Sequence, residues 1–199
     1  DELHAFDSYT GGLIQRLVLW LQALQCRVVL MSATLPAERR NSFLKQWAPN
    51  AELMEVSYPR VSWSDGQSIK ALSFPARRHQ QVQVQGIDAD ISSVAAQAMA
   101  AAKAGARVLV VVNKVARAQA LYSAVASIPT TLFHSHFPME QRLEIEKEVL
   151  SQFGPGGTNY SGHILVATQV AEQSLDMDMD LLITDLAPID LVMQRSGRI

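Results

Sequence analysis

Two adjacent carboxylates open the sequence, in the run Asp1-Glu2-Leu3-His4. Paired acidic side chains at the end of a buried strand can serve a nucleoside triphosphate. One carboxylate holds Mg²⁺, and the next orients and deprotonates the attacking water. A solvated acidic turn is the alternative interpretation of these residues.

Two small hydroxyl side chains, Ser32 and Thr34, come directly after the apolar run 28–31. At the carboxyl end of a strand, such hydroxyls can bond a neighbouring carboxylate or imidazole and relay the state of a bound nucleotide. The alternative is a simple turn, in which Ser or Thr caps the helix that Pro36 opens.

Two further polar groups lie in the last quarter of the chain, in residues 166–176 and in Gln194-Arg195-Ser196-Gly197-Arg198. Arginines on either side of a glycine can bring a guanidinium to a γ-phosphate, where it stabilises the charge of the transition state. A surface helix that carries two arginines is the alternative.

These four groups, in this order and spacing, resemble motifs II, III, V and VI of the superfamily 2 helicases. One branch, the helicase-nuclease of type I CRISPR interference, is similar to this sequence at residues 1–7, 110–119, 132–137, 166–180 and 182–190. The resemblance covers almost the whole chain and is weakest between residues 57 and 105. It implies an ATP-dependent enzyme that uses Mg²⁺ and translocates along single-stranded DNA.

The resemblance also implies roles for individual residues. Asp1 would hold Mg²⁺, Glu2 would position the hydrolytic water, and His4 would couple this site to Ser32, Thr34 and Gln194. Contacts to the nucleotide would come from Ser32, Thr34, Asp176 and Arg195. Arg198 would act as an arginine finger on the γ-phosphate. Contacts to the nucleic-acid backbone would come from Asn113, Ser135, Thr168 and Gln169.

The sequence departs from the family pattern in several respects. It has no Gly-x-x-x-x-Gly-Lys-Ser/Thr loop to cradle the β- and γ-phosphates, so we expect this chain alone to be inactive. His136 stands where the family has arginine. We expect both ends to be cuts through a longer protein, with an HD nuclease domain upstream or on a separate chain and a CRISPR surveillance complex as partner.

Strand and helix patterns alternate along the chain, which predicts βαβ units, parallel sheets and an α/β fold. We expect helices at 13–24, 36–47, 91–103, 114–127 and 138–152. We expect strands at 28–31, 51–56, 81–85, 108–112, 130–133, 163–167 and 180–184.

Two RecA-like lobes are the expected arrangement of these elements. Residues 1–78 would form the C-terminal part of a first lobe, truncated at its N-terminus, plus a crossing segment. Residues 79–199 would form a nearly complete second lobe. ATP would bind in the cleft between the lobes, and single-stranded DNA would cross both lobes on the opposite rim.

The composition limits how the chain can meet a partner. Charged residues make up 18% of the sequence and the net charge is -2, so nucleic acid would have to be held by placed local contacts. A single cysteine, Cys26, indicates a reducing, cytoplasmic setting. No apolar run approaches the roughly 20 residues of a membrane span. Another superfamily 2 helicase acting on RNA or DNA, or a nucleic-acid-binding fragment without hydrolysis, remains an alternative.

Overall fold

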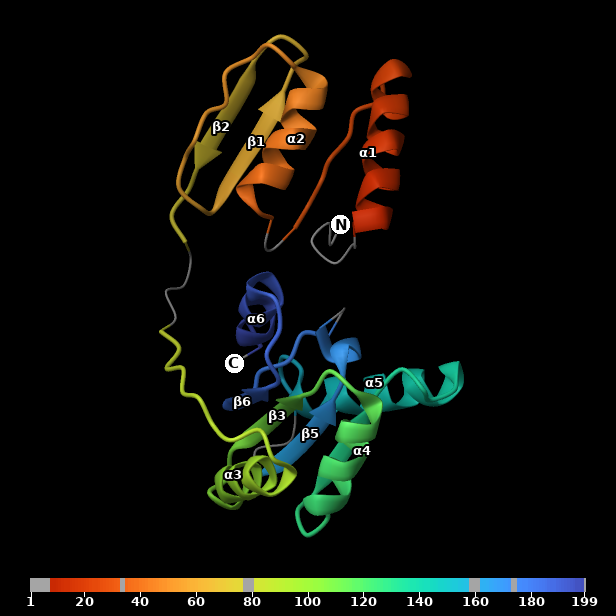
Figure 1. The fold of residues 1–199 in the computed structure, drawn as a ribbon, viewed down its shortest axis with the longest axis vertical. Coiled ribbons are helices and arrows are strands. Elements are labelled where there is room, and N and C mark those ends of the chain that lie inside the picture. Colours follow the sequence, from red (N-terminus) through yellow and green to blue (C-terminus); the bar gives the residue numbers. More distant parts are fainter. Residues whose placement is uncertain (1–7, 33–34, 77–80, 158–161, 173–174, 199) are drawn as a thin grey trace. The chain divides into compact units, whose positions relative to one another are not determined.

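The computed structural model describes residues 8–32, 35–76, 81–157, 162–172 and 175–198 (Figure 1). The chain forms two compact units, Asp1–Gln81 and Val82–Ile199. No helix among the described residues is long and apolar enough to span a membrane.

The first unit contains two helices and a β-hairpin. Helix α1 (Ser8–Ala23) and helix α2 (Ala37–Trp47) pack around Val18 and Phe43. Strands β1 (Arg60–Ser64) and β2 (Ile69–Ser73) pair antiparallel, and α2 lies against β1. The two helices were predicted from the sequence, whereas the hairpin was not.

Three predicted strands do not form among the described residues. Residues 28–31, 51–56 and 81–85 have extended or irregular backbone without a paired neighbour. Val29, for example, is 78% exposed. Apolar or alternating patterns favour a strand only where a second strand supplies the hydrogen bonds, so these predictions were wrong for the structure as described.

The second unit is built on a four-stranded parallel sheet in the order β4-β5-β3-β6 (Figure 1). Its strands are β3 (Arg107–Val111), β4 (Thr130–Phe133), β5 (His163–Ala167) and β6 (Leu181–Thr184). Its helices are α3 (Ile91–Lys103), α4 (Val115–Ala124), α5 (Met139–Phe153) and α6 (Ile189–Ser196), with a short 3-10 turn at Gln169–Glu172. The predicted α/β class with a parallel sheet is confirmed.

Apolar side chains cover both faces of this sheet. Val108, Val110 and Val112 belong to one core cluster, which includes residues of α3 and α4. Leu109 and Val111 point to the opposite face and join a second cluster with residues of α5. Successive residues of a strand face opposite sides, so the unbroken run of apolar residues in β3 is what a doubly covered sheet requires.

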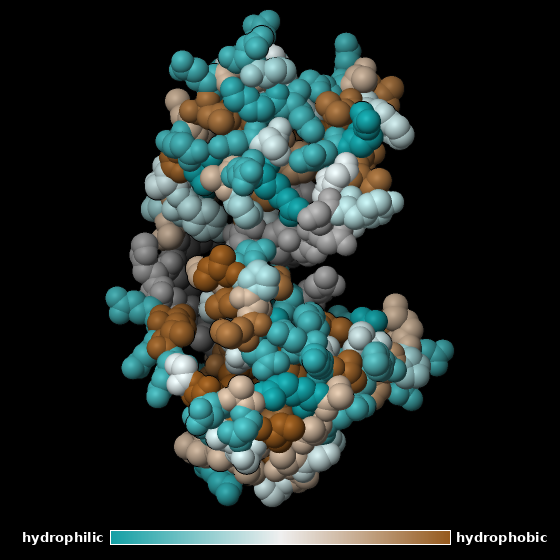
Figure 2. Space-filling model, viewed as in Figure 1, coloured by the Kyte–Doolittle hydropathy of each residue, from teal (hydrophilic) through white to brown (hydrophobic). Residues whose placement is uncertain are grey.

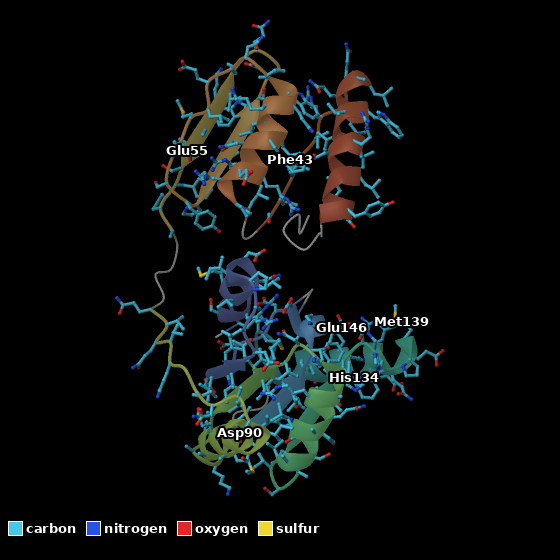
Figure 3. All side chains as sticks on the ribbon, in the orientation of Figure 1. Phe43, Glu55, Asp90, His134, Met139 and Glu146 are labelled. Carbon is cyan, nitrogen blue, oxygen red and sulfur yellow. The ribbon has the colours of Figure 1, made fainter. Side chains whose placement is uncertain are left out.

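The ends of α3 have clear local causes. Asp90 lies at the start of α3 (labelled in Figure 3). Its carboxylate caps the helix by accepting a hydrogen bond from the backbone nitrogen of Ser93 at 2.8 Å. Gly105 follows the helix with a φ of 96°, which favours glycine. Close contact then fixes the start of β5, because Gly162 packs directly against the backbone carbonyl of Ala102.

Candidate functional site

The carboxyl ends of the four strands lie at one edge of the sheet. The register pairs Val111 with both Ala167 and Thr184, and it pairs Phe133 with Ala167. The residues that follow these strands therefore emerge side by side. In open parallel sheets this edge is where ligands bind.

Three of the residues predicted to contact nucleic acid are exposed at this edge. Asn113 follows β3, Ser135 follows β4, and Gln169 follows β5. The side-chain amide of Gln169 donates to the backbone carbonyl of Asn113 at 3.4 Å, which links the ends of β3 and β5. The sheet thus brings together side chains that lie far apart in the sequence.

Thr168, the fourth predicted contact, is placed differently. Thr168 is only 3% exposed, and its backbone nitrogen donates to the carbonyl of Phe133 at 3.1 Å. The element after it is the short 3-10 turn Gln169–Glu172. Thr168 therefore fastens the end of β5 to the end of β4, and its contact with nucleic acid stays a prediction.

A histidine shapes the turn that presents Ser135. His134 is buried directly after β4 (labelled in Figure 3). Its ring stacks on that of Phe137, with ring centroids 4.3 Å apart. Its Nδ1 accepts from the backbone nitrogen of His136 at 3.3 Å. Burial, and then the nearby charge of His136, lowers the pKa of His134, which favours the neutral ring that can accept this hydrogen bond.

The side chain of Arg195 is buried beneath the same edge. It is 1% exposed, and its Nε donates to Oε1 of Glu172 at 2.7 Å. Its Nη1 donates to the hydroxyl of Thr184 and to the carbonyl of Asp185. We expected Arg195 to contact the nucleotide. In this structure all three nitrogens of its guanidinium bond within its own unit.

Glu172 is the residue that the sequence interpretation missed. Its carboxylate receives Arg195, and its backbone carbonyl receives Gln194 Nε2 at 3.1 Å and Arg198 Nη2 at 2.9 Å. The three predicted site residues in or just after α6 therefore all bond to Glu172. The available signal was that Glu172 is the only acidic or basic residue apart from histidine in the stretch 163–175.

Arg198, the predicted arginine finger, also bonds within its own unit. Its Nη1 donates to the carbonyl of Leu175, and Nη2 donates to that of Glu172. Its buried Nε has no hydrogen-bond partner among the described residues. To reach a phosphate, the guanidinium would have to leave these two carbonyls.

The other predicted nucleotide contacts are not brought together in the described structure. Asp176 is exposed between the buried side chains of Leu175 and Met177. Ser32 is half-buried in the first unit. Asp1, Glu2, His4 and Thr34 lie outside the described residues, so the predicted Mg²⁺ ligand is among those not described.

A second acidic residue organises the loop that carries Asn113. The carboxylate of Asp185 accepts from the backbone nitrogen of Asn113 at 3.0 Å and from Nε of Arg117 at 3.1 Å. The side-chain amide of Asn113 donates to the carbonyl of Leu186 at 2.9 Å. The ends of β3 and β6 are thereby joined. In the part of the chain that the structure describes, no three His, Cys, Asp or Glu side chains form a cluster that could hold a metal ion.

Comparisons with known proteins agree with the fold and with the resemblance inferred above. Residues 104–199 match the family model described as "CRISPR-associated nuclease/helicase Cas3, C-terminal". The whole chain aligns at 40% identity with the CRISPR-associated endonuclease/helicase Cas3 of Thermus thermophilus and at 34% with that of Escherichia coli, of which it covers 26% and 24%. The chain thus spans about a quarter of the length of these curated relatives.

Solved structures give the same result. The crystal structure of T. fusca Cas3-ATP matches the whole chain with a TM-score of 0.86 at 32% identity, and 26% of that chain is covered. A chain of a CRISPR RNA-guided surveillance complex, pre-nicking, matches with a TM-score of 0.80 at 32% identity and is covered over 28%. Because these matches extend over the full chain, and because the parallel sheet has the expected order of elements, the chain belongs to the CRISPR-associated Cas3 nuclease/helicase family.

Proposed function

We propose that this chain is part of an ATP-dependent translocase that moves along single-stranded DNA and unwinds invader DNA for degradation in CRISPR antiviral defence. The observation that carries the proposal is the sheet edge at which Asn113, Ser135 and Gln169 are exposed and at which Arg195 of α6 bonds the side-chain oxygen of Asn113. In a translocase these two sets of contacts have to be coupled, because hydrolysis at one has to alter the grip at the other.

The exposed edge fits the backbone of a nucleic acid better than its bases. Amides and hydroxyls such as those of Asn113, Gln169 and Ser135 can donate to phosphate oxygens, which positions a strand without reading its sequence. A chain of net charge -2 has no broad basic surface, so a small number of such contacts would provide the grip.

On the nucleotide side, we propose that Asp1 binds the Mg²⁺ of ATP and that Glu2 orients the attacking water. His4, Ser32, Thr34 and Gln194 would relay the state of this site. Asp176 would contact the ribose, and Arg198 would reach the γ-phosphate. This sequence contains no Gly-x-x-x-x-Gly-Lys-Ser/Thr loop, and we propose that the chain by itself does not hydrolyse ATP.

The named relatives suggest the wider setting. Relatives of this chain have been solved with ATP, AMPPNP and ADP and within a surveillance complex. We propose the same nucleotide and the same kind of complex for the protein that contains this chain, acting in the cytoplasm. The nuclease named in the relatives would reside in an HD domain outside these 199 residues.

The decisive experiment measures ATP turnover by the complete protein with and without single-stranded DNA. We expect DNA to stimulate turnover and Glu2→Gln to abolish it. Binding of a fluorescent single strand, measured by anisotropy, should weaken in Asn113→Ala and Gln169→Ala. It should not weaken in Gln97→Ala, which removes an exposed amide from α3. Turnover that is indifferent to DNA, or equal affinities in all three variants, would contradict the proposal.

A further inference from the structure

One buried ion pair joins three of the strand ends at this edge. Arg195 contacts Glu172 after β5 and Thr184 at the end of β6. Its Nη2 also lies 3.4 Å from the side-chain oxygen of Asn113 after β3. We call Arg195 and Glu172 the positioning pair.

Residues with different predicted roles are attached to this pair. On one side, the Glu172 carbonyl receives Gln194 and Arg198, which are predicted to face the nucleotide. On the other side, Asn113 contacts Arg195 and accepts from Gln169, and both are predicted to face DNA. An unbroken chain of hydrogen bonds therefore runs from the nucleotide residues to the DNA residues through the positioning pair.

Because the pair is buried, it contributes more to fixing the local geometry than to net stability. The side chains of Arg195 and Glu172 are 1% and 8% exposed. A buried ion pair contributes little net stability compared with apolar residues of the same volume, because desolvating both charges offsets their attraction. It does impose one geometry, because a guanidinium bonds a carboxylate and two oxygens only in a fixed fork.

We propose that Arg195 is a positioning residue that transmits nucleotide state to the DNA-contacting loops through Glu172, without touching ATP or DNA itself. This inference rests on the proposed function, which supplies the two ligands. When α6 moves on nucleotide binding or release, Glu172 and Asn113 shift together. Coupling of this kind is reciprocal, so DNA must affect nucleotide binding by the same factor as nucleotide affects DNA binding.

The test measures linkage in the complete protein. The affinity for a fluorescent single strand is determined with and without a non-hydrolysable ATP analogue, and ATP turnover is determined with and without DNA. In Arg195→Gln we expect both ratios to fall by about tenfold, to values near one. A role limited to folding would lower the amount of active protein and leave both ratios unchanged.

A matched control exists at the opposite end of the same two strands. Arg107, at the start of β3, makes a bidentate contact with Asp180, just before β6. Arg107→Gln removes an arginine–aspartate pair from the same sheet, and it should leave both ratios at the wild-type value. A fall in the ratios of the same size in both variants would overturn the inference.

Two further variants cover the case in which Arg195→Gln does not fold. The double variant Glu172→Gln/Arg195→Gln leaves no unpaired buried charge, and Arg195→Lys keeps the charge without the fork. Both should fold and lose the linkage. Retained ratios in a folded variant would refute the positioning role while the proposed function stands. Absence of any DNA stimulation in the wild type would instead refute the proposed function.

Discussion

Nη2 of Arg195 lies 2.6 Å from Oε1 of Glu172, and Nε of the same guanidinium lies 2.7 Å from that oxygen. The two residues are 23 positions apart in the sequence, and both side chains are almost completely enclosed. Removing either partner would therefore leave the other charge enclosed and without its counter-charge.

Removing one partner of this pair should be strongly destabilising. Glu172→Ala leaves a buried guanidinium without its carboxylate, and we expect the free energy of unfolding to fall by about 3–5 kcal/mol. Urea denaturation followed by circular dichroism measures this change. The double variant Glu172→Leu/Arg195→Met should lose much less. A double variant as unstable as the single one would mean that the surrounding oxygens, and not the pair, set the cost.

Gly162 should not tolerate a side chain. A Cβ at this position would lie 1.6 Å from the backbone oxygen of Ala102, so α3 or the start of β5 would have to move. We expect Gly162→Ala to cost at least about 1–3 kcal/mol, the usual cost of overpacking. Gly86→Ala is the control, because a Cβ there meets nothing within 4 Å. Similar melting temperatures for the two variants would contradict this packing.

Mild acid should destabilise the second unit through its buried histidines. Burial lowers the pKa of His163, whose Nε2 lies 3.0 Å from the hydroxyl of Thr131, and burial also lowers the pKa of His134. An imidazole with a depressed folded pKa stabilises the fold above its unfolded value of about 6.5, and this contribution is lost as the pH falls through the folded pKa.

Thermal unfolding followed at a series of pH values from about 7.5 down to about 5.5 tests this expectation, because carboxylates with ordinary pKa values near 4 stay charged in that range. Stability should fall with pH in the wild type. His163→Gln should show a shallower fall, because the amide does not titrate. Identical slopes in the two proteins would rule out His163 as a source of the pH dependence.

Arg198 should matter more for turnover than for folding. In the structure its guanidinium donates to two backbone carbonyls, and such bonds are worth about 1.5–3 kcal/mol each at most. If it reaches the γ-phosphate during hydrolysis, Arg198→Ala should lower DNA-stimulated kcat about a thousandfold or more. Steady-state kinetics on the complete protein, compared with Arg107→Gln, measures this. A loss of activity no greater than the loss of folded protein would leave Arg198 with a structural role alone.

Local sequence patterns predicted the second unit well. The β-branched run in β3 and the capped, alanine-rich α3 carry their signals within a few residues, and the predicted strands 130–133 and 163–167 match the structure. The first unit was predicted less well, because the strand at 28–31 depended on a neighbour that the described residues do not provide. The hairpin was missed because the turn at Asp65 and Gly66 was not recognised.

The candidate site was also predicted only in part from the sequence. Which residues reach the sheet edge followed from their positions after strands, as with Asn113 and Gln169. What each one bonds there did not, because burial of Arg195 and Glu172 depends on helix α6 returning to the turn after β5. Residue spacing along one segment contains no information about a partner on another segment.

The two-faced burial of β3 makes the site sensitive to the length of its central strand. Val108, Val110 and Val112 serve one core, and Leu109 and Val111 serve the other. Deleting a single residue from this strand would exchange the two sets and also carry Asn113 one step back from the edge. Substitutions at exposed positions of the site can therefore be absorbed singly, whereas a one-codon change in β3 would disrupt both cores and the site at once.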